Sequence, residues 1–314
     1  MALLSDNWGI IGHTRQIDAL NRAMESGRLA HAYIFSGPRH VGKTAVLEQV
    51  LTRLLSTPIH LQDGPVTTLV SYICLPEDKK EIPAELVRKL LSFLRLSTFG
   101  HPWKIAVIDD AEHLNPEGAH ALLKTLEEPT PQTIIFLLVQ DASLLLPTIR
   151  SRAATLRFSS VPAAELREHA KGLGLGAGEA DELALISLGL PGLFFHYLRN
   201  QADFATMKEA QAEFLEMLGQ PLWKKLSASA ELAKKPLGTL FAGWQLLLRD
   251  ALLIKHNLPE HASNRGMIDG IRELANTLSS SRILEASRMM AEASSPQRQN
   301  ANAHLFIDNV ILSL

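Results

Sequence analysis

The chain of 314 residues has little cysteine and few aromatic residues: one cysteine, Cys74, and 6% Phe, Trp and Tyr. A single cysteine excludes an internal disulfide framework and a zinc module made of several cysteines, and it suits a reducing compartment. Hydrophobic residues make up 46% of the chain, with many leucines and alanines. This composition favours a helix-rich protein with an aliphatic core, and the length predicts two or three domains.

The chain also lacks an excess of charge of either sign, since its formal net charge is −2. A protein that neutralises DNA phosphates by itself normally has a basic surplus, so we expect any contact with DNA to be local or shared with partners. Residues 1–7 show no basic-then-apolar leader pattern, and no run approaches 18 uncharged apolar residues. We therefore expect a soluble, cytoplasmic protein with no membrane contact.

The most informative segment that is present is residues 37–44, which match the phosphate-loop pattern G-x-x-x-x-G-K-[ST]. Residues 32–35 before it are a short apolar run that predicts a buried strand. Residues 46–55 after it carry valine and leucine at helical spacing. The order strand, loop, helix is the setting in which such a loop binds phosphate.

Each fixed position of this loop has a chemical reason. Gly37 and Gly42 let the backbone N–H groups curl around anionic phosphates, and the start of the following helix adds its positive end. Lys43 is expected to reach the β- and γ-phosphates, and the Thr44 hydroxyl to bind Mg²⁺. The expected ligand is ATP or ADP with Mg²⁺.

Apolar runs alternate with helical patterns over the first half of the chain, which predicts a parallel sheet of five strands. The expected strands are residues 32–35, 67–75, 104–109, 133–139 and 154–158. After residue 162 the sequence shows helical periodicity only. We therefore predict a nucleotide-binding domain at 1–161, a small helical domain at 162–203 and a helical domain at 204–314.

Acidic residues follow the central predicted strand, where a nucleotide-binding sheet presents carboxylates to Mg²⁺. Asp109 is the candidate carboxylate on the Mg²⁺ side. Asp110 or Glu112 could orient a water molecule for attack, with Asp110 the candidate catalytic residue. The alternative interpretation is an exposed acidic turn that caps the next helix.

Two arginines, Arg150 and Arg152, lie at the end of the predicted sheet domain. From these residues alone a solvated surface arginine is the favoured interpretation, with Arg152 paired to a carboxylate at the edge of the sheet. The alternative is chemical: an arginine aimed at the γ-phosphate of a neighbouring subunit would stabilise charge in the transition state.

Several blocks of sequence together resemble the clamp-loader subunits of the AAA+ class in the bacterial DNA polymerase III holoenzyme. These blocks are residues 11–12, 28–38, 108–114, 121–129, 146–152 and 189–192, with 249–250 and 300–305 near the end. The run Leu-Leu-Lys-Thr-Leu-Glu-Glu-Pro at 122–129 is the most specific of them. The resemblance implies an α/β P-loop AAA+ domain, a small helical lid and an all-helical collar that joins subunits.

The same resemblance implies the task and the partners. Clamp-loader subunits form a pentameric assembly that opens a sliding clamp and places it on primed DNA. Within Ser151-Arg152-Ala153, Arg152 matches the arginine finger that acts in trans on a neighbour's ATP. The chain is thereby expected to help load the clamp during DNA replication.

Three departures from the family pattern qualify this expectation. Members usually carry a four-cysteine zinc insert, but residues 59–74 offer one cysteine, so no zinc site is expected. Hydrolysing members carry a polar sensor after the fourth strand and an arginine in the lid, where this chain has Gln140-Asp141 and Gly192. We therefore expect weak or absent hydrolysis, with nucleotide bound weakly or for structure.

Two other functions remain open at this point. One is a hydrolysing AAA+ ATPase, either a motor-type clamp-loader subunit or a stand-alone remodeller, which the intact phosphate loop permits. The other is a nucleotide kinase that uses the same loop. The kinase lacks an obvious phosphate-clamping arginine lid and leaves the helical last third of the chain unexplained.

Overall fold

The computed structural model describes residues 8–61, 68–96, 100–235, 237–293 and 303–314. Three earlier expectations concern residues outside this part: the absence of a leader pattern at residues 1–7, the start of the second strand at residue 67, and the collar-like segment at residues 300–302. Backbone contacts divide the chain into two compact units. One holds the described residues up to Glu165 together with Gly189–Gly192, and the other holds Leu166–Leu188 and Leu193–Leu314. The division into three domains stays a prediction.

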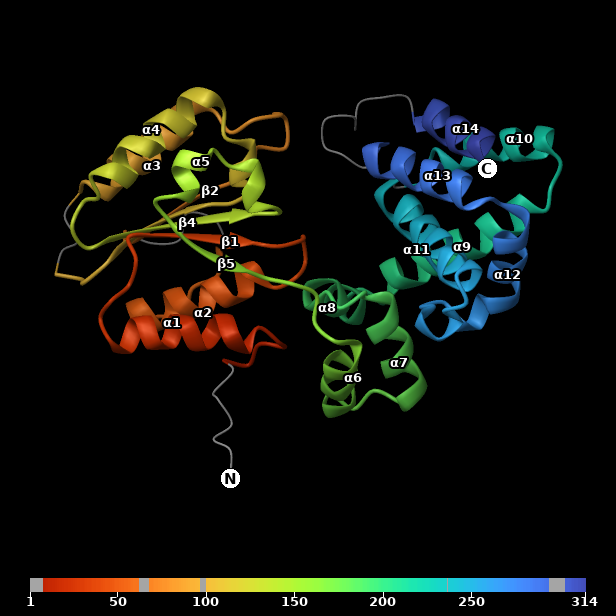
Figure 1. The fold of residues 1–314 in the computed structure, drawn as a ribbon, viewed down its shortest axis with the longest axis horizontal. Helices are drawn as coiled ribbons and strands as arrows, with labels where there is room; N and C mark the ends of the chain where they lie inside the picture. Colours follow the sequence, from red (N-terminus) through yellow and green to blue (C-terminus); the bar gives the residue numbers. More distant parts are fainter. Residues whose placement is uncertain (1–7, 62–67, 97–99, 236, 294–302) are drawn as a thin grey trace. The chain divides into compact units, whose positions relative to one another are not determined.

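The first unit is built on a parallel sheet of five strands in the order β2-β3-β4-β1-β5 (Figure 1). The strands are β1 (Ala32–Ser36), β2 (Val70–Ile73), β3 (Lys104–Ile108), β4 (Thr133–Val139) and β5 (Ala154–Arg157). Every residue of β1, β3 and β4 is buried, which explains their unbroken apolar sequences. The predicted parallel sheet of five strands is therefore confirmed.

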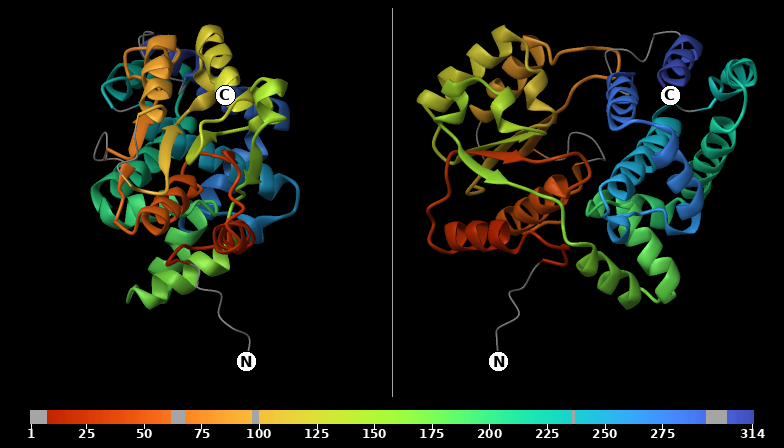
Figure 2. Two further views of the ribbon diagram at one scale, coloured as in Figure 1. Left: turned by 90° about the vertical axis from the view of Figure 1, so that its left-hand side faces the viewer. Right: turned by 45° about the vertical axis from the view of Figure 1, so that its right-hand side comes forward.

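Helices cover both faces of this sheet (Figures 1 and 2). The helices of the unit are α1 (Thr14–Glu25), α2 (Lys43–Leu55), α3 (Ala84–Leu94), α4 (Pro116–Glu127) and the short α5 (Pro147–Arg150). Helices α1 and α2 lie on one face, and α3 and α4 on the other. Short 3-10 helices follow β3 (Ala111–His113) and β4 (Ala142–Leu144).

Local sequence explains where these helices begin. Asn115 caps α4 because its side chain accepts a hydrogen bond of 2.8 Å from the amide of Gly118, and Pro116 occupies the first turn. Helix α2 begins directly at Lys43 of the phosphate loop, after Gly42 at φ +110°. Its N-terminal turn is thus part of the loop itself.

The second unit is all-helical apart from its turns. Its helices are α6 (Ala163–Gly172), α7 (Ala177–Ile186), α8 (Pro191–Arg199), α9 (Gln201–Leu218), α10 (Leu222–Leu232), α11 (Leu237–Lys255), α12 (Ile268–Thr277), α13 (Ser280–Ala293) and α14 (Ala303–Ser313), with α6 and α8 beginning in the first unit. Short 3-10 helices at Pro259–His261 and Arg265–Met267 join α11 to α12. The glycine-rich stretch 172–176 is the turn between α6 and α7, as expected.

Helix α11 is the centre of this unit. Trp244 is fully buried, stacks on Phe214 at 4.5 Å between ring centroids and donates its indole N–H to the carbonyl of Ala210 at 3.1 Å. By length and composition alone α11 could cross a membrane, the one such helix in the described part of the chain, but half of it is buried inside the protein. A core helix passes the same test, and the buried Asp250 of α11 is held by protein donors.

Candidate nucleotide-binding site

A cavity of about 230 Å³ opens at the carboxyl edge of the sheet. Its lining residues come from the phosphate loop and from the ends of β3 and β4: Arg39, His40, Lys43, Thr44, Asp109, Asp110, Leu138, Val139 and Gln140. Ligands of open parallel sheets bind at this edge. Cavities that enclose a whole drug-sized ligand measure about 300–1,000 Å³, so this one matches the phosphate end of a nucleotide.

The two glycines of the loop are required by its geometry. A Cβ atom on Gly37 would lie 2.3 Å from the carbonyl oxygen of Phe158, which directly follows β5. Gly42 has a φ of +110°, which side-chain-bearing residues rarely adopt. The loop therefore lies tightly on the end of the sheet, and neither position tolerates a side chain without a shift of the backbone.

Lys43 lies at the bottom of this cavity and is only 8% exposed. Its ammonium group donates to the carbonyls of Gly37 at 2.5 Å and Pro38 at 3.0 Å. Burial lowers the pKa of Lys43, and the nearby carboxylate of Asp109 opposes that shift. A bound phosphate would supply the opposite charge that carbonyl oxygens supply only in part.

Asp109 faces the same cavity from the end of β3. Its two carboxylate oxygens accept hydrogen bonds from the hydroxyl of Tyr72 at 3.1 Å and from the amide of Asp110 at 2.9 Å. Burial raises the pKa of Asp109 above its usual range, while these donors act against the shift. Thr44 lines the same cavity, so a hydroxyl and a carboxylate stand together, and both are oxygen ligands of the kind Mg²⁺ prefers.

The other two acidic candidates differ in their surroundings. Asp110 forms an ion pair of 3.1 Å with Arg39 of the phosphate loop, and its backbone is left-handed at φ +50°. One carboxylate oxygen of Glu112 accepts from the amide of Gln140 at 3.1 Å, and the other is buried without a hydrogen-bond partner. The role of Asp110 in orienting water stays a prediction.

Arg152 does not line this cavity. One guanidinium nitrogen contacts Glu127 of α4 at 3.0 Å, and the other donates to the carbonyl of Thr148 at 3.1 Å and to the Ser151 hydroxyl at 3.2 Å. The side chain is 36% exposed. Arg152 is therefore held at the surface of the sheet unit, next to the end of α4.

The two positions at which the sequence was expected to depart from hydrolysing members, Gln140-Asp141 and Gly192, have structural partners of their own. Asp141 accepts a hydrogen bond from the amide of Ser143 at 2.8 Å, which lowers its pKa and caps the short helix after β4. Gly192 donates its amide N–H to the carbonyl of His40 in the phosphate loop at 2.7 Å. A Cβ on Gly192 would lie 2.8 Å from that same oxygen, so an arginine cannot occupy this position in this arrangement.

Sequence patterns did not reveal two members of this site. Tyr72 contacts Asp109 from the neighbouring strand β2, and Arg39 forms an ion pair with Asp110. Within the described residues, no three or more His, Cys, Asp or Glu side chains are grouped so that they could hold a metal ion by themselves. A Mg²⁺ ion here would need phosphate or water oxygens as its remaining ligands.

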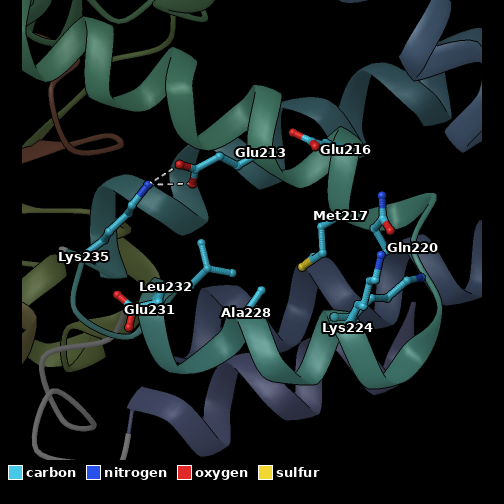
Figure 3. Close-up of a pocket in the computed structure, with 10 residues that line it drawn as sticks. Glu213, Glu216, Met217, Gln220, Lys224, Ala228, Glu231, Leu232 and Lys235 are labelled. Atoms are coloured by element: carbon cyan, nitrogen blue, oxygen red, sulfur yellow. Dashed lines mark hydrogen bonds and ion pairs between the residues drawn. The ribbon is translucent and has the colours of Figure 1, made fainter.

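A larger cavity of about 480 Å³ lies in the second unit, between α9 and α10 (Figure 3). Its floor is apolar, with Met217 and Leu232, and Lys235 closes one end by contacting both carboxylate oxygens of Glu213 at 2.6 Å. Acidic side chains lie mainly on the α9 side and lysines on the α10 side. This cavity lacks the loop and the paired oxygen ligands that the first cavity has.

The chain is similar to subunits of bacterial DNA polymerase III. Residues 12–162 match the model of the family described as DNA polymerase III, delta subunit. The DNA polymerase III subunit delta' of Pseudomonas aeruginosa is 32% identical over 215 residues, which is 64% of this chain and 64% of that protein. The match thus spans less than two thirds of the length of that relative.

Other relatives are similar over a shorter part. The DNA polymerase III subunit tau of Escherichia coli is 29% identical over 172 residues, which covers 50% of this chain and 26% of that one. Among solved structures, a DNA polymerase III gamma subunit-related protein from Thermotoga maritima covers 95% of this chain and 97% of its own, with a TM-score of 0.49 at 18% identity.

Proposed function

We propose that this chain is a delta-prime-like clamp-loader subunit that acts in DNA replication, because residues 12–162 match the DNA polymerase III delta family model and a DNA polymerase III subunit delta' is 32% identical over 215 residues. It binds ATP or ADP with Mg²⁺ weakly or for structural purposes, and it contributes an arginine to a neighbouring ATPase subunit. Its partners are the other subunits of a pentameric, cytoplasmic assembly. Through that assembly it acts on the sliding clamp and on primed DNA.

One observation carries the nucleotide-binding part of this proposal. The loop lysine and an acidic side chain that directly follows β3 line one cavity, together with the loop threonine: Lys43, Asp109 and Thr44. When bound, Mg²⁺ would bridge phosphate oxygens and neutralise part of their charge. Thr44 and Asp109 would hold it there, and Lys43 would bind the β- and γ-phosphates.

Weak hydrolysis is supported by the contact between Gly192, in the predicted lid, and His40 of the phosphate loop. Hydrolysing relatives are expected to use a lid arginine to neutralise charge that develops on the γ-phosphate, and this chain has Gly192 there. The amide of Gly192 is bonded to His40, and a side chain at that position would meet backbone atoms of the loop. The chain therefore has neither the charge nor the space for it.

We further propose that Arg152 acts in trans. Its pairing with Glu127 keeps the guanidinium at the surface rather than in the chain's own cavity, as a group that acts on a neighbour requires. An arginine finger contributes about 10³–10⁵ to the rate of the site it serves. In an assembly with several sites, the total loss on removing Arg152 is expected to be partial.

The decisive experiment is titration of the purified chain with Mg²⁺-ADP. Lys43→Ala should weaken binding by roughly ten- to a hundredfold, since hydrogen bonds to charged groups contribute about 1.5–3 kcal/mol. Lys89→Ala, an exposed lysine of α3, is the matched control and should bind like the wild type. Equal affinity in Lys43→Ala and wild type would contradict the proposed role of Lys43.

A second assay separates the proposal from its rival, a hydrolysing motor-type ATPase, which the intact phosphate loop favours. The isolated chain should show little ATPase activity, whereas an assembled clamp loader should lose activity when it carries Arg152→Ala. The neighbouring exposed Arg150→Ala is the control for the assembly. Turnover of several per second by the isolated wild-type chain would establish the rival.

A further inference from the structure

Two groups outside the phosphate loop donate hydrogen bonds to its backbone carbonyls, and neither has a role in the function proposed above. The first is the amide of Gly192, which donates to the carbonyl of His40 at 2.7 Å. His40 has a left-handed backbone at φ +62°, which side-chain-bearing residues rarely adopt. Gly192 belongs to the same compact unit as the loop.

The second group is the imidazole of His13, which precedes α1. Its Nε2 atom lies 2.7 Å from the carbonyl oxygen of Val41, the next residue of the loop. A carbonyl oxygen only accepts, so Nε2 carries the hydrogen. Burial lowers the pKa of His13, and its ring also packs edge-on against Phe158 at 5.0 Å. His13 is thus a neutral donor in a fixed orientation.

The directions of these two bonds decide where the loop amides point. In a planar trans peptide the carbonyl of one residue and the N–H of the next point in opposite directions. A carbonyl of His40 turned toward Gly192 therefore turns the N–H of Val41 away from Gly192. In the same way, a carbonyl of Val41 turned toward His13 turns the N–H of Gly42 away from His13.

We propose that His13 and Gly192 are positioning residues of the phosphate loop. By holding the carbonyls of His40 and Val41 from outside, they direct the amides of Val41 and Gly42 toward the bound phosphates. This inference rests on the proposed nucleotide binding and adds how the loop is kept ready for it. Consecutive amides that point to one side form an anion-binding concavity.

The other carbonyls of the loop support the same arrangement. Those of Gly37 and Pro38 accept from Lys43, and that of Gly42 accepts from Val46 in the first turn of α2. Together with the two bonds from outside, five loop carbonyls have donors. Oriented amides need no reorganisation when the anion binds, which favours affinity.

The test compares substitutions that keep or remove the donor at residue 13. His13→Gln keeps an amide nitrogen close to the position of Nε2, and His13→Leu fills similar space without a donor. Both replace histidine at the same left-handed backbone, φ +61°, so both carry the same backbone cost. We expect His13→Leu to weaken Mg²⁺-ADP and inorganic pyrophosphate binding roughly three- to tenfold, and His13→Gln to bind much closer to wild type.

Gly192→Ala tests the second bond independently, so that one variant decides if the other fails to fold. Its Cβ would displace the His40 carbonyl, and we expect a similar loss of affinity for both probes. Gly178→Ala in α7 is the matched control, because a Cβ there meets nothing within 4 Å. Thermal melting of each variant measures stability separately from affinity.

The outcomes distinguish this inference from the function it rests on. A folded wild-type chain that binds neither probe overturns the nucleotide-binding proposal and this inference with it. Wild-type binding that is unchanged in folded His13→Leu or Gly192→Ala overturns this inference alone. Equal losses of affinity in His13→Gln and His13→Leu also overturn it, because the donor would then be irrelevant.

Discussion

Two aspartates, one in each unit, differ in how many hydrogen-bond donors the protein supplies to a carboxylate that is shielded from water. Asp250 of α11 is fully buried, and its oxygens accept from Arg249 at 3.0 Å, from the amides of Ser263 and Asn264 at 2.9 and 2.8 Å, and from the Asn264 side chain at 2.8 Å. Asp109 is partly exposed, has two donors and faces a cavity.

The difference concerns what each carboxylate has left to bind. Four donors satisfy Asp250 within the protein, so it fixes the turn after α11 and has little capacity for a ligand. Asp109 has only two donors and lines the cavity together with Lys43, so it keeps lone pairs for a ligand. Burial disfavours its charged form and raises its pKa. A saturated carboxylate thus supports the fold, and an unsaturated one is available for a cation.

The largest effect on stability should come from removing the carboxylate of Asp250, whose oxygens accept from four donors. Asp250→Ala removes the acceptor of three buried donors and the ion-pair partner of Arg249, which we expect to lower the free energy of unfolding by about 3–5 kcal/mol. Chemical denaturation measures it. Asp269→Ala is the control, because Asp269 pairs with Arg272 at the surface and should cost at most about 1 kcal/mol. Equal costs would show that the buried and the exposed aspartate contribute alike to stability.

A smaller and different effect is expected at the unsaturated site. Asp109→Asn should weaken binding of ADP in the presence of Mg²⁺ by roughly tenfold, since a charged oxygen ligand becomes neutral. Binding of ADP without Mg²⁺ should change little. Titrations with and without the metal measure both, with the exposed Asp78→Asn as control. A loss of affinity that is the same without Mg²⁺ would show that Asp109 does not act through the metal.

The smallest effect is a pH-dependent gain in stability. The folded-state pKa of Asp109 lies above its ordinary value of 3.8, so its contribution to stability is complete below that value and is lost as the pH rises through the folded pKa. Asp109→Asn has no such loss. Urea unfolding between pH 4 and 7 should show the variant gaining on the wild type as the pH rises, and a variant that falls behind at pH 7 would contradict the direction of the shift.

Much of the sheet unit could be predicted from local sequence. Unbroken apolar runs identified β3 and β4, and the loop pattern predicted the helix that follows it, α2, which in the structure begins at Lys43. The second strand was expected over 67–75, but β2 is limited to Val70–Ile73, and of these residues only Val70 is buried. The surface pairing weighed for Arg152 is present, with Glu127 as its partner.

The rest depends on contacts between residues far apart in the chain. His13 and Val41 are 28 residues apart, and Tyr72 and Asp109 are 37 apart. No periodicity or motif encodes such pairs, since each side chain by itself fits many environments. A histidine before a helix and a tyrosine in a strand both read as ordinary residues until the fold brings their partners to them.

The order of the strands has a consequence for how the chain is made. β1, from which the phosphate loop emerges, pairs with β4 and β5, and the loop contacts Gly192. A ribosome that has just completed Ser36 must therefore add every residue up to Gly192 before the loop meets its last contact. At about 5–20 residues per second this takes roughly 8–30 s. During that interval the nascent loop lacks the surroundings that shape it, so nucleotide cannot guide the early stages of its folding.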